Sequence, residues 1–154
     1  MNNAEILREN YHKIIEQLPV DVQLVAVSKT NPIQAIQAVY DAGQRVFGEN
    51  KVQELKDKFE YLNAVPHVNH FIGHLQTNKT KDLLKCNVSC IHSIDRIDLA
   101  EKLHQRLLKE DKTMEVLIQV NTSFEESKYG AAPGEVIGLV QQIATLSTLK
   151  IKGL

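Results

Sequence analysis

The chain has 154 residues, 43% of them hydrophobic, which is enough for one ordinary domain with a single core and excludes a disordered chain. Its 18 Lys and Arg residues against 19 Asp and Glu give a formal net charge of -1, so no overall field favours nucleic acid or an anionic membrane. No stretch reaches the roughly 18 apolar residues that span a bilayer, and the N-terminus carries no hydrophobic signal core. We therefore expect a cytoplasmic protein with neither a membrane nor nucleic acid as its partner.

Short β-rich segments alternate with amphipathic ones along the chain. A first helix is predicted at residues 4–17. The predicted strands are, in chain order, Val22–Ser28, Arg45–Gly48, Val68–Gly73, Val88–His92, Glu115–Asn121 and Leu149–Leu154. Helices with start signals at Asn31–Pro32, Asp95 and Pro133 are predicted between them, at Ile33–Ala42, Ile97–Leu108 and Val136–Leu146. The first strand is almost continuously apolar, which is typical of a parallel strand buried on both faces.

This alternation predicts an α/β fold, either a doubly wound sheet or a (β/α)8 barrel of the TIM type. Successive predicted strands begin 20 to 34 residues apart, so eight such units would need roughly 220 residues. We therefore expect a single barrel domain over residues 1–154, truncated after about the sixth strand. The first and sixth strands would then expose long apolar edges, and we expect these edges either to pair with a second copy, as a dimer, or to be covered by a separate C-terminal piece.

Lys29 directly follows the first predicted strand. Ligand sites in α/β folds lie at the carboxyl ends of parallel strands, and a lysine amine placed there can attack a carbonyl carbon. A solvated lysine at the end of a strand is the simpler alternative. Its position makes Lys29 a candidate for covalent chemistry.

Two more strands end in polar segments at the same predicted rim. Gly48 and Gly73 would let the backbone approach a ligand, and Asn50 and Asn78 can hydrogen-bond to one. Turn formation or helix capping is the alternative role for both asparagines. We expect Asn50 to contact a ligand and Asn78 to act mainly as a cap.

Metal binding and cysteine redox chemistry are not expected from the sequence. His70 and His74 have the spacing of a helical metal pair but fall on a strand and its exit, where that spacing gives no shared face. Cys86 and Cys90 lack the C-x-x-C spacing, and we expect a reduced, buried thiol at Cys90.

A long polar loop follows the fifth predicted strand. It contains Asn121 and Lys128, and Lys128 could provide a cation for a phosphate, although a solvated lysine is again the simpler alternative. The chain contains neither a Walker A sequence nor G-x-G-x-x-G, so the ordinary nucleotide motifs are absent.

Taken together, these motifs resemble those of the pyridoxal phosphate homeostasis protein family. The matching segments cover most of the chain in the same order and are Val25–Thr30, Phe47–Asn50, His70–Lys79, Ile91–Asp95, Val120–Ser123 and Glu126–Gly130. The resemblance implies a barrel like the N-terminal domain of alanine racemase, with Lys29 at the position of the lysine that forms a Schiff base. It also implies binding and management of pyridoxal 5'-phosphate (PLP) in the cell, without an established turnover reaction.

We expect the cofactor to contact Lys29, Asn50, His74, Asn121 and Lys128. The partners would be PLP itself and the PLP-dependent apoenzymes that receive it. The sequence stops before the Ser- and Gly-rich segment and the Arg-Gly segment that hold the phosphate in the family. A PLP-dependent amino acid racemase and a scaffold without a ligand are the competing functions.

Overall fold

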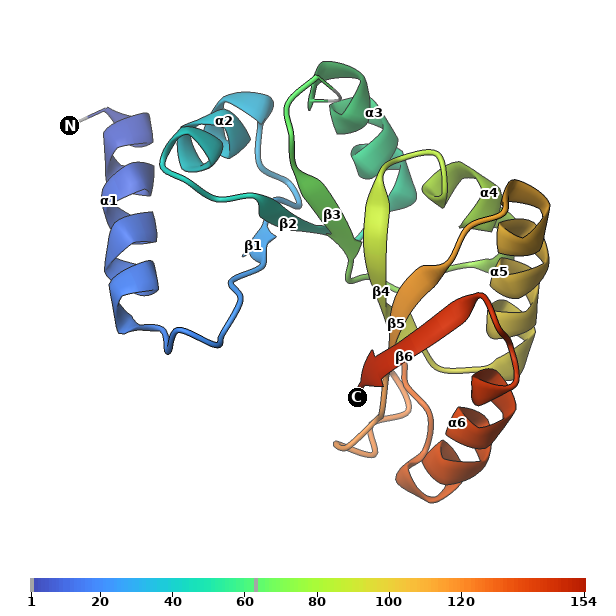
Figure 1. Cartoon of the computed structure of the whole chain (residues 1–154). Coiled ribbons are helices and arrows are strands. Elements are labelled where there is room, and N and C mark those ends of the chain that lie inside the picture. Colours follow the sequence, from blue (N-terminus) through green and yellow to red (C-terminus); the bar gives the residue numbers. More distant parts are fainter. Residues whose placement is uncertain (1, 63) are drawn as a thin grey trace.

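Six strands form one parallel sheet, and helices alternate with them along the chain (Figure 1). The structure is a computed structural model, and it describes residues 2–62 and 64–154. The strands are β1 (Ala26–Val27), β2 (Val46–Glu49), β3 (Val68–Phe71), β4 (Val88–Ile94), β5 (Met114–Ile118) and β6 (Leu149–Gly153). The α-helices are α1 (Asn3–Gln17), α2 (Ile33–Asp41), α3 (Val52–Leu62), α4 (Thr80–Leu83), α5 (Ile97–Glu110) and α6 (Val136–Ala144). Two short 3-10 helices, η1 (Thr77–Lys79) and η2 (Pro133–Glu135), precede α4 and α6.

The strand order in the sheet is the order in the chain, β1 to β6, and every neighbouring pair is parallel. A doubly wound sheet would instead reverse its order at a switch point. The prediction of an α/β fold is therefore confirmed, and the sequential order is that of the barrel type. None of the described helices is both long and apolar enough to cross a membrane.

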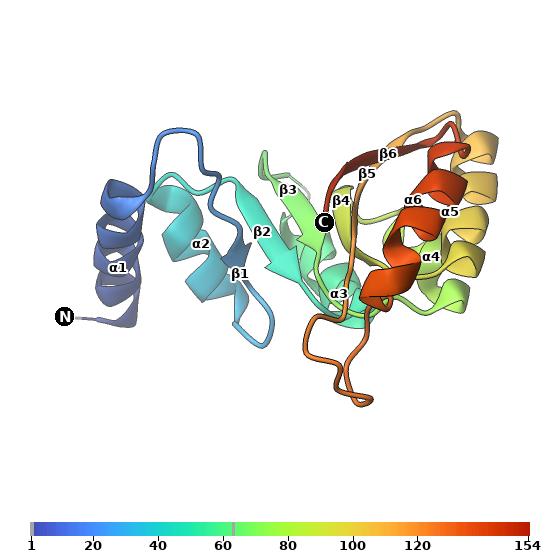
Figure 2. The same ribbon diagram turned by 90° about the horizontal axis from the view of Figure 1, so that it is seen from below.

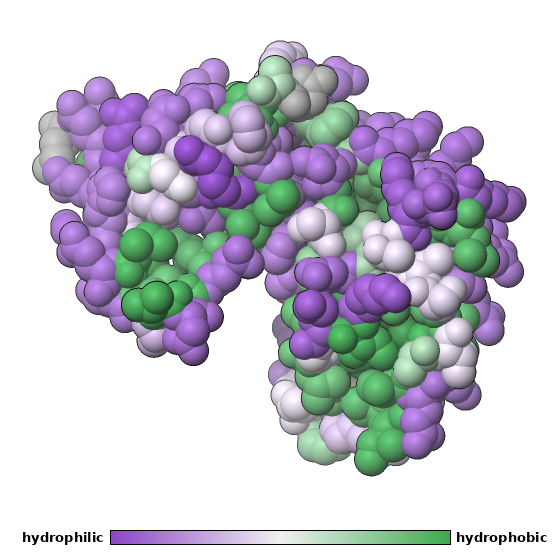
Figure 3. All heavy atoms as spheres, in the orientation of Figure 1, coloured by the Kyte–Doolittle hydropathy of each residue, from purple (hydrophilic) through white to green (hydrophobic). Residues whose placement is uncertain are grey.

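The sheet is strongly curved, and helices α2 to α6 lie along its outer side, with α1 packed against α2 (Figures 1 and 2). The main core fills the layer between the sheet and helices α3 to α6, where Phe71, Ile91, Val116 and Leu149 are buried. Strand side chains alternate between two faces, so the neighbouring register positions Cys90, Glu115 and Lys150 lie on the inner, concave face. The inner face borders the hollow seen between the two arms of the molecule in Figure 3.

The first strand is much shorter than predicted. Only Ala26 and Val27 pair with β2, and Val22 and Val27 are each 48% exposed, so the expectation of a strand buried on both faces is wrong. The physical reason is that β1 lies at the sheet edge and has a single neighbouring strand. The expectation of two long apolar edges is also wrong, because β1 has only two residues and β6 alternates Leu149 and Ile151 with the exposed Lys150 and Lys152.

The residues that begin two of the helices differ from those predicted. Pro32 rather than Asn31 is the N-cap of α2, and Arg96 rather than Asp95 is that of α5; neither side chain caps its helix. Gly43 follows α2 with a φ of 120°, a conformation that favours glycine. Helices α3 and α4 were not predicted. Cys86 and Cys90 are free cysteines, and the expected burial of Cys90 is confirmed.

Candidate functional site

Lys29 lies in a defined turn beyond the carboxyl end of β1. Its carbonyl oxygen accepts hydrogen bonds from the Thr30 hydroxyl at 2.6 Å and from the Asn31 amide at 3.1 Å. Thr30 has a φ of 61°, which is uncommon for a residue with a branched side chain, and its N–H donates to Glu54 at 2.8 Å. The Lys29 side chain is exposed, and none of the hydrogen bonds or ion pairs within residues 2–62 and 64–154 engages its amine.

A buried polar network fixes the strand end beneath this turn. The Ser28 hydroxyl donates to Glu49 Oε1 at 2.7 Å, and Lys58 Nζ forms an ion pair with the same oxygen. Lys58 also donates to the Ser28 carbonyl at 2.7 Å. Glu49 is 1% exposed, so this carboxylate depends on its two partners. The residue before Lys29 is thereby tied to β2 and to α3.

Glu54 connects the turn to the same helix. Its carboxylate accepts from the Thr30 N–H and lies 3.5 Å from Lys58 Nζ. The backbone hydrogen bond from Thr30, assisted by the positive charges of Lys58 and Lys51, lowers the pKa of Glu54 below its ordinary value of 4.5.

Asn50 and His74 meet where the ends of β2 and β3 approach each other. A Cβ atom at Gly73 would lie 2.0 Å from the Asn50 carbonyl oxygen, so only glycine fits there. Asn50 Oδ1 and His74 Nδ1 are buried without a hydrogen-bond partner among the described residues. Both residues line a cavity of about 310 Å³ together with Gln76 and Lys79.

The loop after β5 reaches the same place through Tyr129. The rings of Tyr129 and His74 are stacked, with centroids 3.6 Å apart and an interplanar angle of 13°. Asn121 Nδ2 donates to the carbonyls of Glu125 and Lys128 at 3.0 and 3.4 Å, so this side chain shapes the loop. The Lys128 side chain is exposed.

The structure thus brings some of the candidate residues together. Asn50 and His74 share a cavity, and His74 contacts the loop that carries Asn121 and Lys128. Lys29 lies at the same end of the sheet, but it does not line that cavity.

Four further residues support the site and were not predicted to do so: Glu49, Glu54, Lys58 and Tyr129. The roles of Glu49, Glu54 and Lys58 depend on contacts made by α3, and this helix was not predicted. Glu54 and Lys58 nevertheless have the i, i+4 spacing of a helical ion pair.

Comparisons with known proteins bear directly on these motifs. Residues 3–154 match the family model described as "Alanine racemase, N-terminal domain". The chain is 44% identical over 134 residues to the pyridoxal phosphate homeostasis protein of Helicobacter pylori, across 86% of this chain and 60% of the relative. It is 40% identical over 143 residues to the Mus musculus protein of the same name, across 88% of this chain and 52% of that relative.

The chain belongs to the pyridoxal phosphate homeostasis protein family. The resemblance found in its motifs is therefore confirmed. The chain spans 60% of the length of the Helicobacter pylori member.

Solved structures agree with this assignment. PipY of Synechococcus elongatus, solved with PLP bound, superimposes with a TM-score of 0.89 at 34% sequence identity, covering 96% of this chain and 68% of PipY. An alanine racemase of Clostridium difficile has a TM-score of 0.77 at 15% identity, which shows a shared fold.

Proposed function

We propose that this homeostasis family member binds PLP as a Schiff base on Lys29 and holds the reactive aldehyde without turning over a substrate. The observation that carries the proposal is the exposed amine of Lys29, which no described residue engages, on a turn that Glu54 and the Ser28–Glu49–Lys58 network hold in place. The PLP in the PipY structure supports the choice of cofactor.

The polar residues at this end of the sheet suit a phosphorylated pyridine aldehyde. When bound, PLP supplies an electrophilic carbonyl carbon; the Lys29 amine adds to it, a C=N bond forms and water leaves. The unpartnered atoms Asn50 Oδ1 and His74 Nδ1 can orient a polar ligand, and Lys128 offers a positive charge for a phosphate. We further propose that Asn121 acts by shaping the loop that carries Lys128.

The partners of such a protein are PLP and the PLP-dependent apoenzymes that accept it. The chain spans 60% of the Helicobacter pylori relative. We propose that it also delivers PLP to these apoenzymes.

Incubation with PLP followed by borohydride reduction tests the assignment. We expect the imine absorbance to appear in the wild-type chain and the reduced adduct to be found on the peptide that contains Lys29. Lys29→Ala should lose both signals with little change in stability, because the side chain is exposed. Lys102→Ala is the matched control, because Lys102 is an exposed lysine on α5.

Two results would contradict the proposal. An undiminished, trapped imine in Lys29→Ala would place the chemistry on another residue. Stereochemical exchange of alanine by the purified chain, lost in Lys29→Ala, would show a racemase instead of a carrier.

A further inference from the structure

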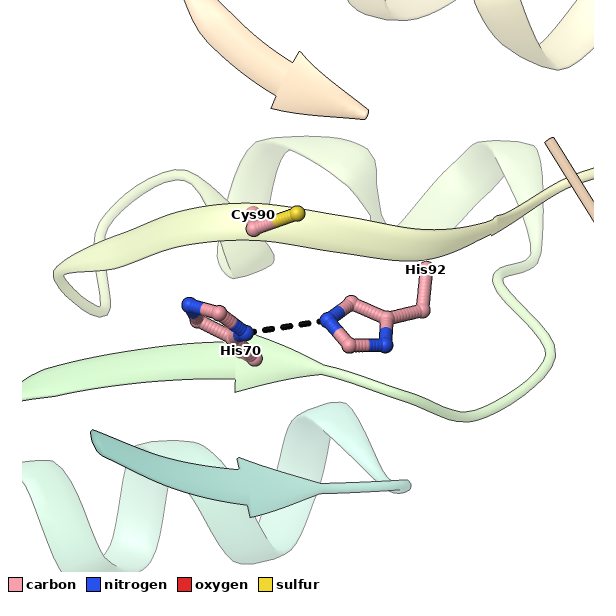
Figure 4. A group of neighbouring side chains, drawn as sticks. All are labelled: His70, Cys90 and His92. Carbon is pink, nitrogen blue, oxygen red and sulfur yellow. Dashed lines mark hydrogen bonds between the residues drawn. The ribbon is translucent and has the colours of Figure 1, made fainter. Parts of the chain in front are cut away.

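Three side chains that bind metals well meet on the inner face of the sheet. In the sequence they lie more than 40 positions after Lys29. His70 lies on β3, and Cys90 and His92 lie on the adjacent strand β4. His70 is in register with Cys90, and His92 follows two residues later on the same face. The ligand atoms of all three lie within 4.8 Å of one another. Figure 4 shows the two imidazoles facing each other between the strands.

The two histidines are already in direct contact. His70 Nδ1 and His92 Nε2 are 2.9 Å apart, and the ring centroids are 5.0 Å apart. One nitrogen must donate a proton to the other in this hydrogen bond. Each ring can move that proton to its other nitrogen, so both facing nitrogens can present a lone pair to a cation without any change in net charge.

The surroundings favour the neutral imidazoles that bind a metal, but they also favour the protonated thiol of Cys90, which does not. Burial lowers the pKa of both histidines, and the neighbouring His92 lowers that of His70 further, while Glu115 acts in the opposite direction on His70. Burial, with a smaller contribution from Glu115, raises the pKa of the Cys90 thiol to about 11. A metal ion must therefore displace the thiol proton when it binds.

Glu115 adds a negative charge next to this cluster. It is the register partner of Cys90 on β5, and its carboxylate lies 3.3 Å from Lys152 Nζ on β6. The carboxylate favours a cation on this face, while Lys152 offsets part of its charge.

The donor set matches zinc. Two imidazole nitrogens and one thiolate are common Zn²⁺ ligands, and a fourth position left to water gives the tetrahedral geometry of an open site. With Zn–N bonds of about 2.1 Å, two nitrogens of a tetrahedral site lie about 3.4 Å apart, so the observed pair, 2.9 Å apart, must separate by about 0.5 Å. With a Zn–S bond of about 2.3 Å, the sulfur of a tetrahedral site lies about 3.6 Å from each nitrogen, so the Cys90 sulfur, which is within 4.8 Å of both, must approach by at most about 1.2 Å.

We propose that His70, Cys90 and His92 form a binding site for one Zn²⁺ ion, with water as the fourth ligand. The sequence predicted no metal site, because it paired His70 with His74 along the chain. The residue that lies against His70 is instead His92 on the neighbouring strand.

Metal titration of the full 154-residue chain, freed of metal by a chelator and without PLP, tests the site. We expect one Zn²⁺ per chain by calorimetry, and a thiolate-to-metal charge-transfer band when Co²⁺ is used as the spectroscopic probe. Cys90→Ser should abolish that band and weaken Zn²⁺ binding by at least about tenfold. Cys86→Ser is the matched control, because Cys86 is also a buried free cysteine but is not a member of this cluster.

Folding of each variant is checked by circular dichroism. His92→Gln is the second variant, and we expect it to weaken Zn²⁺ binding as Cys90→Ser does. A folded wild-type chain that binds no Zn²⁺ would overturn the proposal. So would a Co²⁺ spectrum that is unchanged in Cys90→Ser, because cobalt would then be bound elsewhere. Lys29→Ala should keep full Zn²⁺ binding, which separates this result from the fate of the PLP proposal.

Discussion

Glu54 determines how firmly the turn that carries Lys29 is held. Its carboxylate is the partner of the Thr30 N–H, and Thr30 has a positive φ that an isolated chain would seldom adopt. A charge-assisted hydrogen bond of this kind is stronger than one between neutral groups. By holding the backbone of Thr30, Glu54 helps to position the neighbouring Lys29, and it does not itself need to touch a ligand.

Glu54→Gln should loosen this turn and slow imine formation with PLP by a few-fold. The pKa of Glu54 is lowered in the folded state, so the stability that its charge contributes is present above its ordinary pKa of 4.5 and is lost as the pH falls through the folded-state pKa. Glutamine does not titrate. Urea denaturation across this acidic range should therefore show the difference between wild type and variant shrinking as the pH falls. A difference that is independent of pH would contradict this role.

Substitutions of Asn50 and Asn78 test which of the two asparagines contributes to PLP binding. Asn50 Oδ1 is buried without a partner, whereas Asn78 lies exposed within η1 and its side chain does not cap that helix, so the expected capping role of Asn78 is wrong. We expect Asn50→Ala to raise the Kd for PLP about tenfold and Asn78→Ala to leave it within about twofold, since only the former removes a polar atom near a ligand. Absorbance titrations would measure both constants. Equal constants in the two variants would refute the ranking.

At the scale of elements, the ends of β2 and β3 are joined by a contact between main chains. Gly73→Ala should destabilise the fold by about 3 kcal/mol, because the added methyl group meets the Asn50 carbonyl and backbone atoms must move. Gly138→Ala on α6 is the control, since open space surrounds its Cβ position and alanine favours a helix by about 1 kcal/mol. Thermal melts of both variants would measure the two effects, and a Gly73→Ala melt matching wild type would contradict the close approach.

Periodicity was sufficient to predict the strands with two neighbours and the long helices. The strand predicted at Val88–His92 is confirmed within the longer β4, and the helix predicted at Ile97–Leu108 lies within α5. The first strand was overestimated because an apolar run shows which residues prefer burial but not how many strands flank them. Helix α3 has buried apolar residues at Val52, Leu55 and Leu62, and Asn50 precedes it as a candidate start signal, but the segment between Leu55 and Leu62 is mostly charged and the helix was not predicted.

The candidate site could likewise be predicted only in part from the sequence. The rim position of Lys29 could be predicted, because it depends only on where a strand ends. The contacts between His70 and His92, and between His74 and Tyr129, could not be predicted, because each joins residues more than 20 positions apart. Such contacts depend on strand register, which the pattern of one chain does not specify.

For the molecule as a whole, β1 and β6 each have one neighbouring strand. Their outward backbone groups can pair with another strand, and the concave face adds exposed side chains such as Val27. We expect the purified chain to associate into dimers, and light scattering over a range of concentrations with intact-mass analysis would show this. A monomer at every concentration with a cooperative melt would contradict it, and the two lysines on β6 would then explain why this edge stays single.

The stacking of Tyr129 on His74 also makes the site observable by optical means. The chain contains no tryptophan, so Tyr129→Trp would introduce a single indole at the ring that covers His74. Its emission would respond to whatever displaces or polarises that ring, and the arrival of a molecule in the neighbouring cavity could be followed in real time without any label.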